Sequence, residues 1–260
     1  MRYLALLAAL LLLSLTAACS ERGRTLDDLP TPITDLDAYA TALVMTQNAP
    51  PERFREVIRY PRLDDGLADV SGWRGVISLD FDGVFAGTSR PARGHVTAEV
   101  YYNELATARR VLLSTEGELL TAGQAARLEA VRIGRDTYQV SENSCAITTD
   151  TPSASVADLG AGALIGGVRE ARPTGEKQRI NGVDVWRYAF LQDALDVSPS
   201  VQALDGARVT LLGGELWFSP EHETIVRFYL TLDVENARVF GSQVPLTGLV
   251  VMRYDLFDIG

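Results

Sequence analysis

The stretch TIVRFYLTLDV, residues 224–234, alternates between two kinds of side chain over its whole length. Its even-numbered positions from 226 to 234 are all large and apolar, whereas most of the odd-numbered positions carry arginine, tyrosine, threonine or aspartate. A period of two is typical of a β-strand that buries one face. The sequence around this stretch is therefore expected to supply partner strands for a sheet.

Strand signals continue on both sides of this stretch. The dipeptide Asn181-Gly182 is the strongest hairpin signal in the chain, because a type I′ turn needs positive φ at both central residues. The arms of this hairpin are expected at residues 176–180 and 183–190. Three more strands are predicted closer to the C-terminus, at residues 209–212, 215–219 and 249–258.

The same alternation extends toward the N-terminus. In residues 75–85, the apolar side chains of Ile77, Leu79 and Phe81 alternate with polar ones, and residues 95–102 repeat the pattern. Shorter strands are expected at residues 109–114, 128–133, 137–140 and 145–149. The total is about ten strands, close to the number at which an open sheet curls.

Helical signals are few. Apolar residues recur at helical spacing in residues 36–44, and Phe54, Val57 and Ile58 indicate a second short helix. Residues 155–168, SVADLGAGALIGGV, indicate either a glycine-interrupted helix or an apolar loop, which is either a mobile lid or an element packed against the sheet. One helix followed by many strands predicts an antiparallel α+β fold.

Composition excludes several classes of protein. The chain has a formal net charge of −10, so non-specific nucleic-acid binding is disfavoured. Only two cysteines and two histidines are present, which argues against a disulfide framework and against a metal centre. We therefore expect no metal, no cofactor and no nucleic-acid partner.

The N-terminus predicts export. Residues 1–18 start with a basic residue and continue with an uncharged segment rich in leucine and alanine, which is typical of a signal peptide. The sequence LTAAC at residues 15–19 resembles the bacterial lipobox, which implies that the Cys19 thiol receives a diacylglyceryl group, that the peptide is then cleaved in front of Cys19, and that the anchored residue carries palmitate. The alternative is an ordinary secretory cleavage after Ala18.

This interpretation divides the chain into three parts. Residues 1–18 are the lipoprotein signal peptide, residues 19–34 are a lipid-anchored tether, and residues 35–260 form a single domain. The expected location is extracytoplasmic, at the outer face of the cytoplasmic membrane or at the outer membrane. By resemblance to enterobacterial sorting, Ser20 after the cysteine permits an outer-membrane destination where the host has such a membrane.

Three local patterns carry a family resemblance. They are GEKQRINGV at residues 175–183 running into WRY at 186–188, GELWF at 214–218 followed by IVR at 225–227, and YDLFD at 254–258. As a set they resemble the lipoprotein-carrier superfamily, which includes the periplasmic lipoprotein chaperones of the LolA type and the mycobacterial lipoproteins of the LppX and LprG type.

The resemblance implies a strongly curved antiparallel sheet, a half-barrel, with helices over its concave face and an apolar cavity between the two. It also implies a lipid or an acylated molecule as ligand, held or carried by a membrane-anchored protein. The apolar strand residues expected to line the cavity are Leu79, Phe81, Val100, Tyr102, Tyr138, Val140, Trp186, Tyr188, Phe228 and Leu230.

Two other functions remain open in the sequence. The same fold with a filled core would serve as an interaction or sensing module for a partner protein of the cell envelope. An anchored hydrolase is the weaker alternative, because Asp80-Phe81-Asp82-Gly83 resembles a phosphatase motif without the cationic group and the acidic pair that such chemistry needs. Cys145 has no histidine at a supporting spacing, so we expect no enzyme.

Overall fold

The structure is a computed structural model that describes residues 48–121, 126–197 and 200–260. The account below concerns the compact unit Val44–Gly260 as far as its residues are described. The predicted signal peptide, Cys19, the tether and the helix at residues 36–44 lie outside the described residues.

Strands dominate the described residues. They form one open sheet of 13 strands, with the order β1-β8-β9-β11-β12-β13-β2-β3-β4-β5-β6-β7 and with β10 paired to β8. Every strand pair in it is antiparallel. The strands are β1 (Ile58–Tyr60), β2 (Gly72–Phe85), β3 (Pro91–Asn103), β4 (Ala108–Glu116), β5 (Ala126–Ile133), β6 (Asp136–Ser141), β7 (Ser144–Ile147), β8 (Gly167–Ile180), β9 (Val183–Ala189), β10 (Leu195–Asp196), β11 (Val201–Ser219), β12 (Thr224–Val239) and β13 (Leu246–Phe257).

The helical elements of the described residues are short. They are η2 (Glu52–Phe54), η3 (Asp65–Leu67), α3 (Glu118–Thr121), α4 (Thr151–Ala157), α5 (Ala161–Leu164) and η4 (Gln192–Ala194). Asp150 caps α4 by accepting a hydrogen bond from the Ser153 amide at 2.9 Å.

The sheet buries most of one face, which we call the core face, and on the opposite, outer face a smaller cluster is buried on β8, β9, β11 and β12. Alternation along each strand places Ile77, Leu79 and Phe81 of β2 on the core face, and cross-strand pairing aligns Leu79 with Met252 and Val96. These side chains belong to one large cluster that also includes most buried residues of β11 and β12. Burial of this face is the main source of stability, at about 25 cal/mol per Å² of apolar surface.

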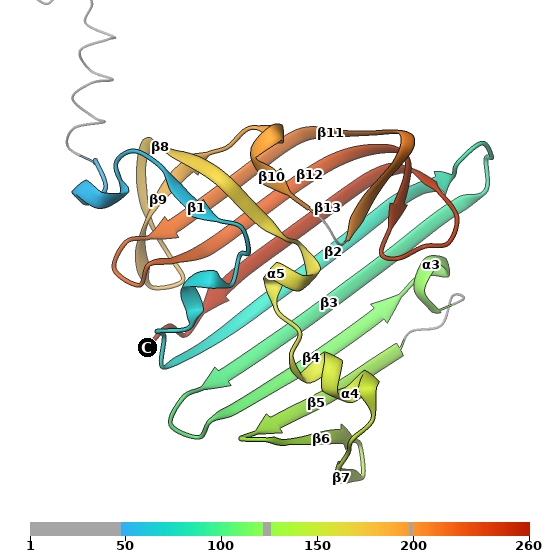
Figure 1. Cartoon of the computed structure of the whole chain (residues 1–260), viewed down its shortest axis with the longest axis horizontal. Coiled ribbons are helices and arrows are strands. Elements are labelled where there is room, and N and C mark those ends of the chain that lie inside the picture. Colours follow the sequence, from blue (N-terminus) through green and yellow to red (C-terminus); the bar gives the residue numbers. More distant parts are fainter. Residues whose placement is uncertain (1–47, 122–125, 198–199) are drawn as a thin grey trace, which may run out of the picture. The chain divides into compact units, whose positions relative to one another are not determined.

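Strand β8 folds part of the chain over the core face. Its first half pairs with β1 on one side and β10 on the other, whereas its second half joins the main sheet through β9. The pairing register with β9 shifts between Pro173 and Lys177, where Gly175 has a φ of +85°. In Figure 1, β1, β8 and α5 lie in front of the long strands. Val168 and Ile165 from this layer belong to the same core cluster.

Polar contacts fasten the segment that joins α4 and α5 to the sheet. Arg109 of β4 donates a hydrogen bond to the carbonyl of Leu159, and Arg132 of β5 pairs with Asp158 at 2.6 Å. Asp64 accepts a hydrogen bond from the Gly162 amide at 3.2 Å. These contacts favour a packed element over a mobile lid.

Strand β11 is only partly paired on the side that faces β9. Strand β9 reaches only Leu216, Trp217 and Phe218, so among the described residues no strand lies next to residues 208–215 on that side. The side-chain amide of Gln192 takes the place of a strand there. It donates to the Val209 carbonyl at 2.7 Å and accepts from the Leu211 amide at 3.0 Å.

Most of the strand predictions are confirmed, and the antiparallel sheet with them. Asn181 and Gly182 both have positive φ, as the predicted turn requires. Two predictions were wrong in detail. Residues 209–212 and 215–219 are one strand, because register shifts let β11 continue past Gly213. The predicted helix around Phe54 is a single 3-10 turn followed by β1. Residues 155–168 follow the first of their two predicted alternatives, an interrupted helix, because they contain the end of α4, then α5 after Gly160, and the start of β8.

Candidate functional site

Eight of the ten residues predicted to line a cavity share the core face. They come from β2, β3, β9 and β12, and six of them are at most 3% exposed. They pack against other side chains of the same chain, so the middle of the core face is filled. The eight are Leu79, Phe81, Val100, Tyr102, Trp186, Tyr188, Phe228 and Leu230.

The structure places Tyr138 and Val140 on the outer face, away from the other eight. Ala130 of β5 is fully buried on the core face, and its partner on β6 is Gln139. Since neighbouring residues of a strand point to opposite sides, Tyr138 and Val140 point outward. Their apolar character reflects a different surface, which is described below.

A cavity of about 580 Å³ lies beside the filled core. Its volume is within the range of small-molecule sites, which is about 300–1,000 Å³. It is bounded by the first half of β8, the end of β9 and η4. The lining residues are Arg169, Glu170, Arg172, Ala189, Phe190, Leu191, Asp193 and Ala194.

Phe190 connects this cavity to the core. Its ring stacks on Phe228 with centroids 5.5 Å apart, and Phe228 is fully buried. On β11, Gly214 leaves room for the Phe190 ring, because a Cβ at that position would lie 2.3 Å from the ring. Leu191, the next residue, is 73% exposed. The apolar part of the cavity thus runs from an exposed leucine inward to the core aromatic pair.

The rim of the cavity carries balanced charges. Arg169 donates a hydrogen bond to the Asp193 carbonyl, and Arg172 forms an ion pair with Glu170 at 2.9 Å. Arg172 is largely exposed, so this pair contributes little to stability. An apolar floor with a polar rim is suited to an amphiphile whose polar end stays at the surface.

The sequence reasoning missed the residues that make this cavity. Phe190 is the last residue of the predicted hairpin arm at 183–190, and Leu191 and Ala194 lie just beyond it. The available signal was that an apolar run of Ala189, Phe190 and Leu191 breaks the alternation of the strand before it. Such a run at the end of a strand indicates that the chain leaves the sheet and contacts apolar groups on more than one side.

Buried hydroxyls lie near this region of the core. Tyr188 donates a hydrogen bond to the Phe54 carbonyl at 2.8 Å, and Tyr60 donates one to the Glu223 carbonyl. Burial raises the pKa of Tyr188, and burial together with the Glu223 carboxylate raises the pKa of Tyr60 to about 12. Both groups therefore stay neutral donors at physiological pH and serve to position η2 and β1.

The candidate catalytic groups lie apart from the cavity. Asp80 and Asp82 point to the outer face of β2, where they pair with His95 and Arg93 of β3. Cys145 is exposed on β7, which is separated from β3, the strand of His95, by three intervening strands in the sheet order. The described residues contain no group of three or more histidine, cysteine or acidic side chains that could hold a metal ion.

None of the helices in the described ranges is both long and apolar enough to cross a membrane. No family model matches the chain, and no curated protein matches it. Among solved structures, the chain is similar to a DUF1329 family protein from Desulfovibrio piger ATCC 29098. The two share 9% sequence identity over 85% of this chain and 93% of that chain, with a TM-score of 0.18. A likeness this distant establishes no common fold or function.

Proposed function

We propose that this protein is an extracytoplasmic lipoprotein that binds an acyl chain of a lipid or acylated molecule. In this proposal Cys19 carries the membrane anchor, and the sheet is a half-barrel of the lipoprotein-carrier type with β8, α4 and α5 over its concave face. The single observation that carries it is the cavity floored by Ala189, Phe190 and Leu191, which adjoins the core through the stacked Phe190.

The position of the cavity determines where the ligand would lie. Because the middle of the core face is filled by its own side chains, an acyl chain would lie along Phe190 and Ala194 at the edge of the sheet. The polar end of the ligand would remain beside Arg169 and Arg172. The pocket is open to solvent on one side, so an acyl chain would exchange contact with water for contact with Phe190 and Ala194.

Substitution of Ala189 by tryptophan tests the site. Ala189 lines the cavity and is exposed, so the indole can fill the space without displacing the core. With the full chain purified from membranes and loaded with radiolabelled palmitate, we expect Ala189→Trp to lower the bound fraction about tenfold or more. The matched control is Ala203→Trp at an exposed alanine of β11. Equal palmitate binding by both variants would remove the cavity as the site.

The anchor has a separate test. Cys19→Ser is expected to move the protein from the membrane fraction to the soluble fraction, because the thioether can no longer form. Retention of this variant in the membrane fraction would contradict the lipobox interpretation. The palmitate-loading result does not depend on this outcome.

The filled core favours a second candidate function. A fold whose core face is packed by its own side chains can act as an interaction or sensing module for another envelope protein. Absence of lipid in native mass spectra of the purified full chain, with palmitate binding unchanged in Ala189→Trp, would support this function over acyl-chain binding.

A further inference from the structure

The outer face of β5, β6 and β7 carries an exposed apolar patch, which we call the outer patch. Pairing places Val131 opposite Tyr138, and Tyr138 opposite Ile147. These are cross-strand neighbours on one face, where side chains touch. The patch consists of Val131, Ile133, Tyr138, Val140 and Ile147.

Two residues of the outer patch are exposed, and the other three are half-buried. Ile147 is 62% exposed and Ile133 is 50% exposed. Single exposed apolar residues are ordinary, but a contiguous group of them on one face marks an interaction surface. The described residues that follow β7 do not cover it, because α4 packs on the other side through Ser153 and Ala157.

The neighbouring turn extends the patch to the end of the sheet. Leu105, in the β3–β4 turn, is 96% exposed. Its turn is held in one conformation, since Asn103 accepts a hydrogen bond from the Ala106 amide at 3.0 Å. The Gly134 amide donates to the Thr107 carbonyl at 3.0 Å, which joins this turn to the β5–β6 turn after Ile133. A fixed turn thus presents an exposed leucine next to Ile133.

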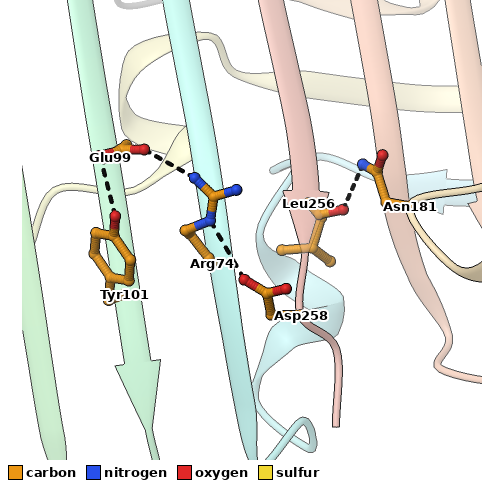
Figure 2. A network of polar contacts seen from close by, with 6 residues as sticks. All are labelled: Arg74, Glu99, Tyr101, Asn181, Leu256 and Asp258. Atoms are coloured by element: carbon orange, nitrogen blue, oxygen red, sulfur yellow. Dashed lines mark hydrogen bonds and ion pairs between the residues drawn. The ribbon is translucent and has the colours of Figure 1, made fainter.

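The first described residue, Asn48, lies at the same end of the sheet. Trp186 donates a hydrogen bond to the carbonyl of Asn48 at 2.6 Å. Figure 2 shows how this end is tied together, with Asn181 donating to the Leu256 carbonyl at 2.8 Å and Arg74 bridging Glu99 and Asp258. The turns after β3, β5 and β8 and the C-terminus all lie along this end.

We propose that the outer patch and Leu105 dock this protein against the surface of a lipid bilayer. The proposal rests on the proposed anchor at Cys19, which precedes Asn48 by 28 intervening residues and would tether the chain to the membrane through the end of the sheet where Asn48 lies. Tyr138 in the patch and Tyr101 beside it have the apolar body and polar tip that suit a headgroup region.

The charges around the patch indicate whether docking requires anionic lipid. Arg110 lies between Tyr101 and Val131, and its Nε pairs with Glu129 at 2.8 Å. Because these charges neutralise each other, docking depends on apolar insertion and not on anionic lipid. It is therefore expected to occur on phosphatidylcholine vesicles and to persist at high salt.

Cys145 provides the probe for the test. It lies on the outer face opposite Val140 and is exposed, so a fluorophore on its thiol reports directly on the patch. The full chain, purified from membranes and labelled, is mixed with phosphatidylcholine vesicles whose acyl chains carry a nitroxide quencher. We expect strong quenching at position 145. The control is Cys145→Ser with Leu212→Cys, whose label lies on β11 and is expected to stay unquenched.

Substitutions in the patch test whether its apolar side chains cause the quenching. Ile133→Ser or Ile147→Ser, at exposed positions that do not support the core, is expected to lower vesicle-dependent quenching about tenfold. Val244→Ser, a matched change of an exposed apolar residue at the opposite end of the sheet, is expected to leave it unchanged. Equal quenching at positions 145 and 212 would overturn the proposal, and so would the absence of quenching at position 145.

Flotation of the vesicles separates this inference from the anchor. A chain that floats without quenching at position 145 overturns docking alone. A chain that is quenched there but does not float supports docking and removes the anchor. A chain that does neither overturns both. Palmitate binding in the cavity is read independently of all three outcomes.

Discussion

The strands from β11 to β3 and the strands from β5 to β7 are built from similar side chains but end in different environments. In the first group, Phe228, Leu230 and Leu79 are at most 1% exposed, because the layer of β1, β8 and α5 covers their face. In the second group, Ile147 is exposed and Tyr138 is half-buried on the outer face. An apolar residue in a strand is therefore buried by what covers its face, and alternation alone does not say which face is covered.

The largest expected difference between the two groups is in stability. Phe228→Ala removes a fully buried ring that also stacks on Phe190, and we expect it to lower the free energy of unfolding by about 3–5 kcal/mol. Tyr138→Ala on the outer face is expected to cost less than about 1 kcal/mol. Urea unfolding followed by tryptophan fluorescence measures both, and a comparable loss in the two variants would contradict the contrast.

A pair of adjacent glycines tests how closely Phe190, which follows β9, packs on β11. A methyl group at Gly214 would collide with the Phe190 ring, whereas one at Gly213 would meet nothing within 4 Å. We expect Gly214→Ala to lower the free energy of unfolding by about 1–3 kcal/mol. Gly213→Ala is expected to stay within about 0.5 kcal/mol of the wild type. Equal melting temperatures for the two variants would show that Phe190 does not rest on β11.

A smaller loss of stability is expected at alkaline pH, through the buried tyrosines that pack in the core. Burial raises the pKa of Tyr254 and Tyr188, and the pKa of Tyr60 rises to about 12. In the unfolded chain these phenols titrate near pH 10. Their contribution is therefore complete below about pH 10 and is lost as the pH rises toward the folded-state values, so the free energy of unfolding falls in that range.

Tyr254→Phe isolates this effect. The Tyr254 hydroxyl is buried and has no hydrogen-bond partner among the described residues, so its removal is expected to cost almost nothing at neutral pH. Above about pH 10 the variant is expected to lose less stability than the wild type, since one buried phenol no longer ionises. Urea unfolding at several alkaline pH values measures the free energy of unfolding of both proteins. An equal decrease with pH in the two proteins would contradict this prediction.

The sequence was informative wherever the signal is local. The alternation in residues 224–234 located β12, and Asn181-Gly182 located the β8–β9 turn, because both depend only on neighbouring residues. The side on which Tyr138 and Val140 lie depends on the register between β5 and β6, which is a relation between strands. The cavity beside Phe190 depends on β8 changing partners halfway along its length, and no local pattern encodes that change.

The hydrogen bonds of Gln192 to β11 affect how one copy of the protein can associate with another. An unpaired strand edge is a template on which a second chain can add, and repetition of that step produces fibres. A single side-chain amide occupies the donor and acceptor of β11 at Leu211 and Val209, and it cannot present a backbone edge of its own to the next chain. The residue thus blocks the addition of a strand at this part of β11, which matters most for a protein that an anchor would concentrate in two dimensions.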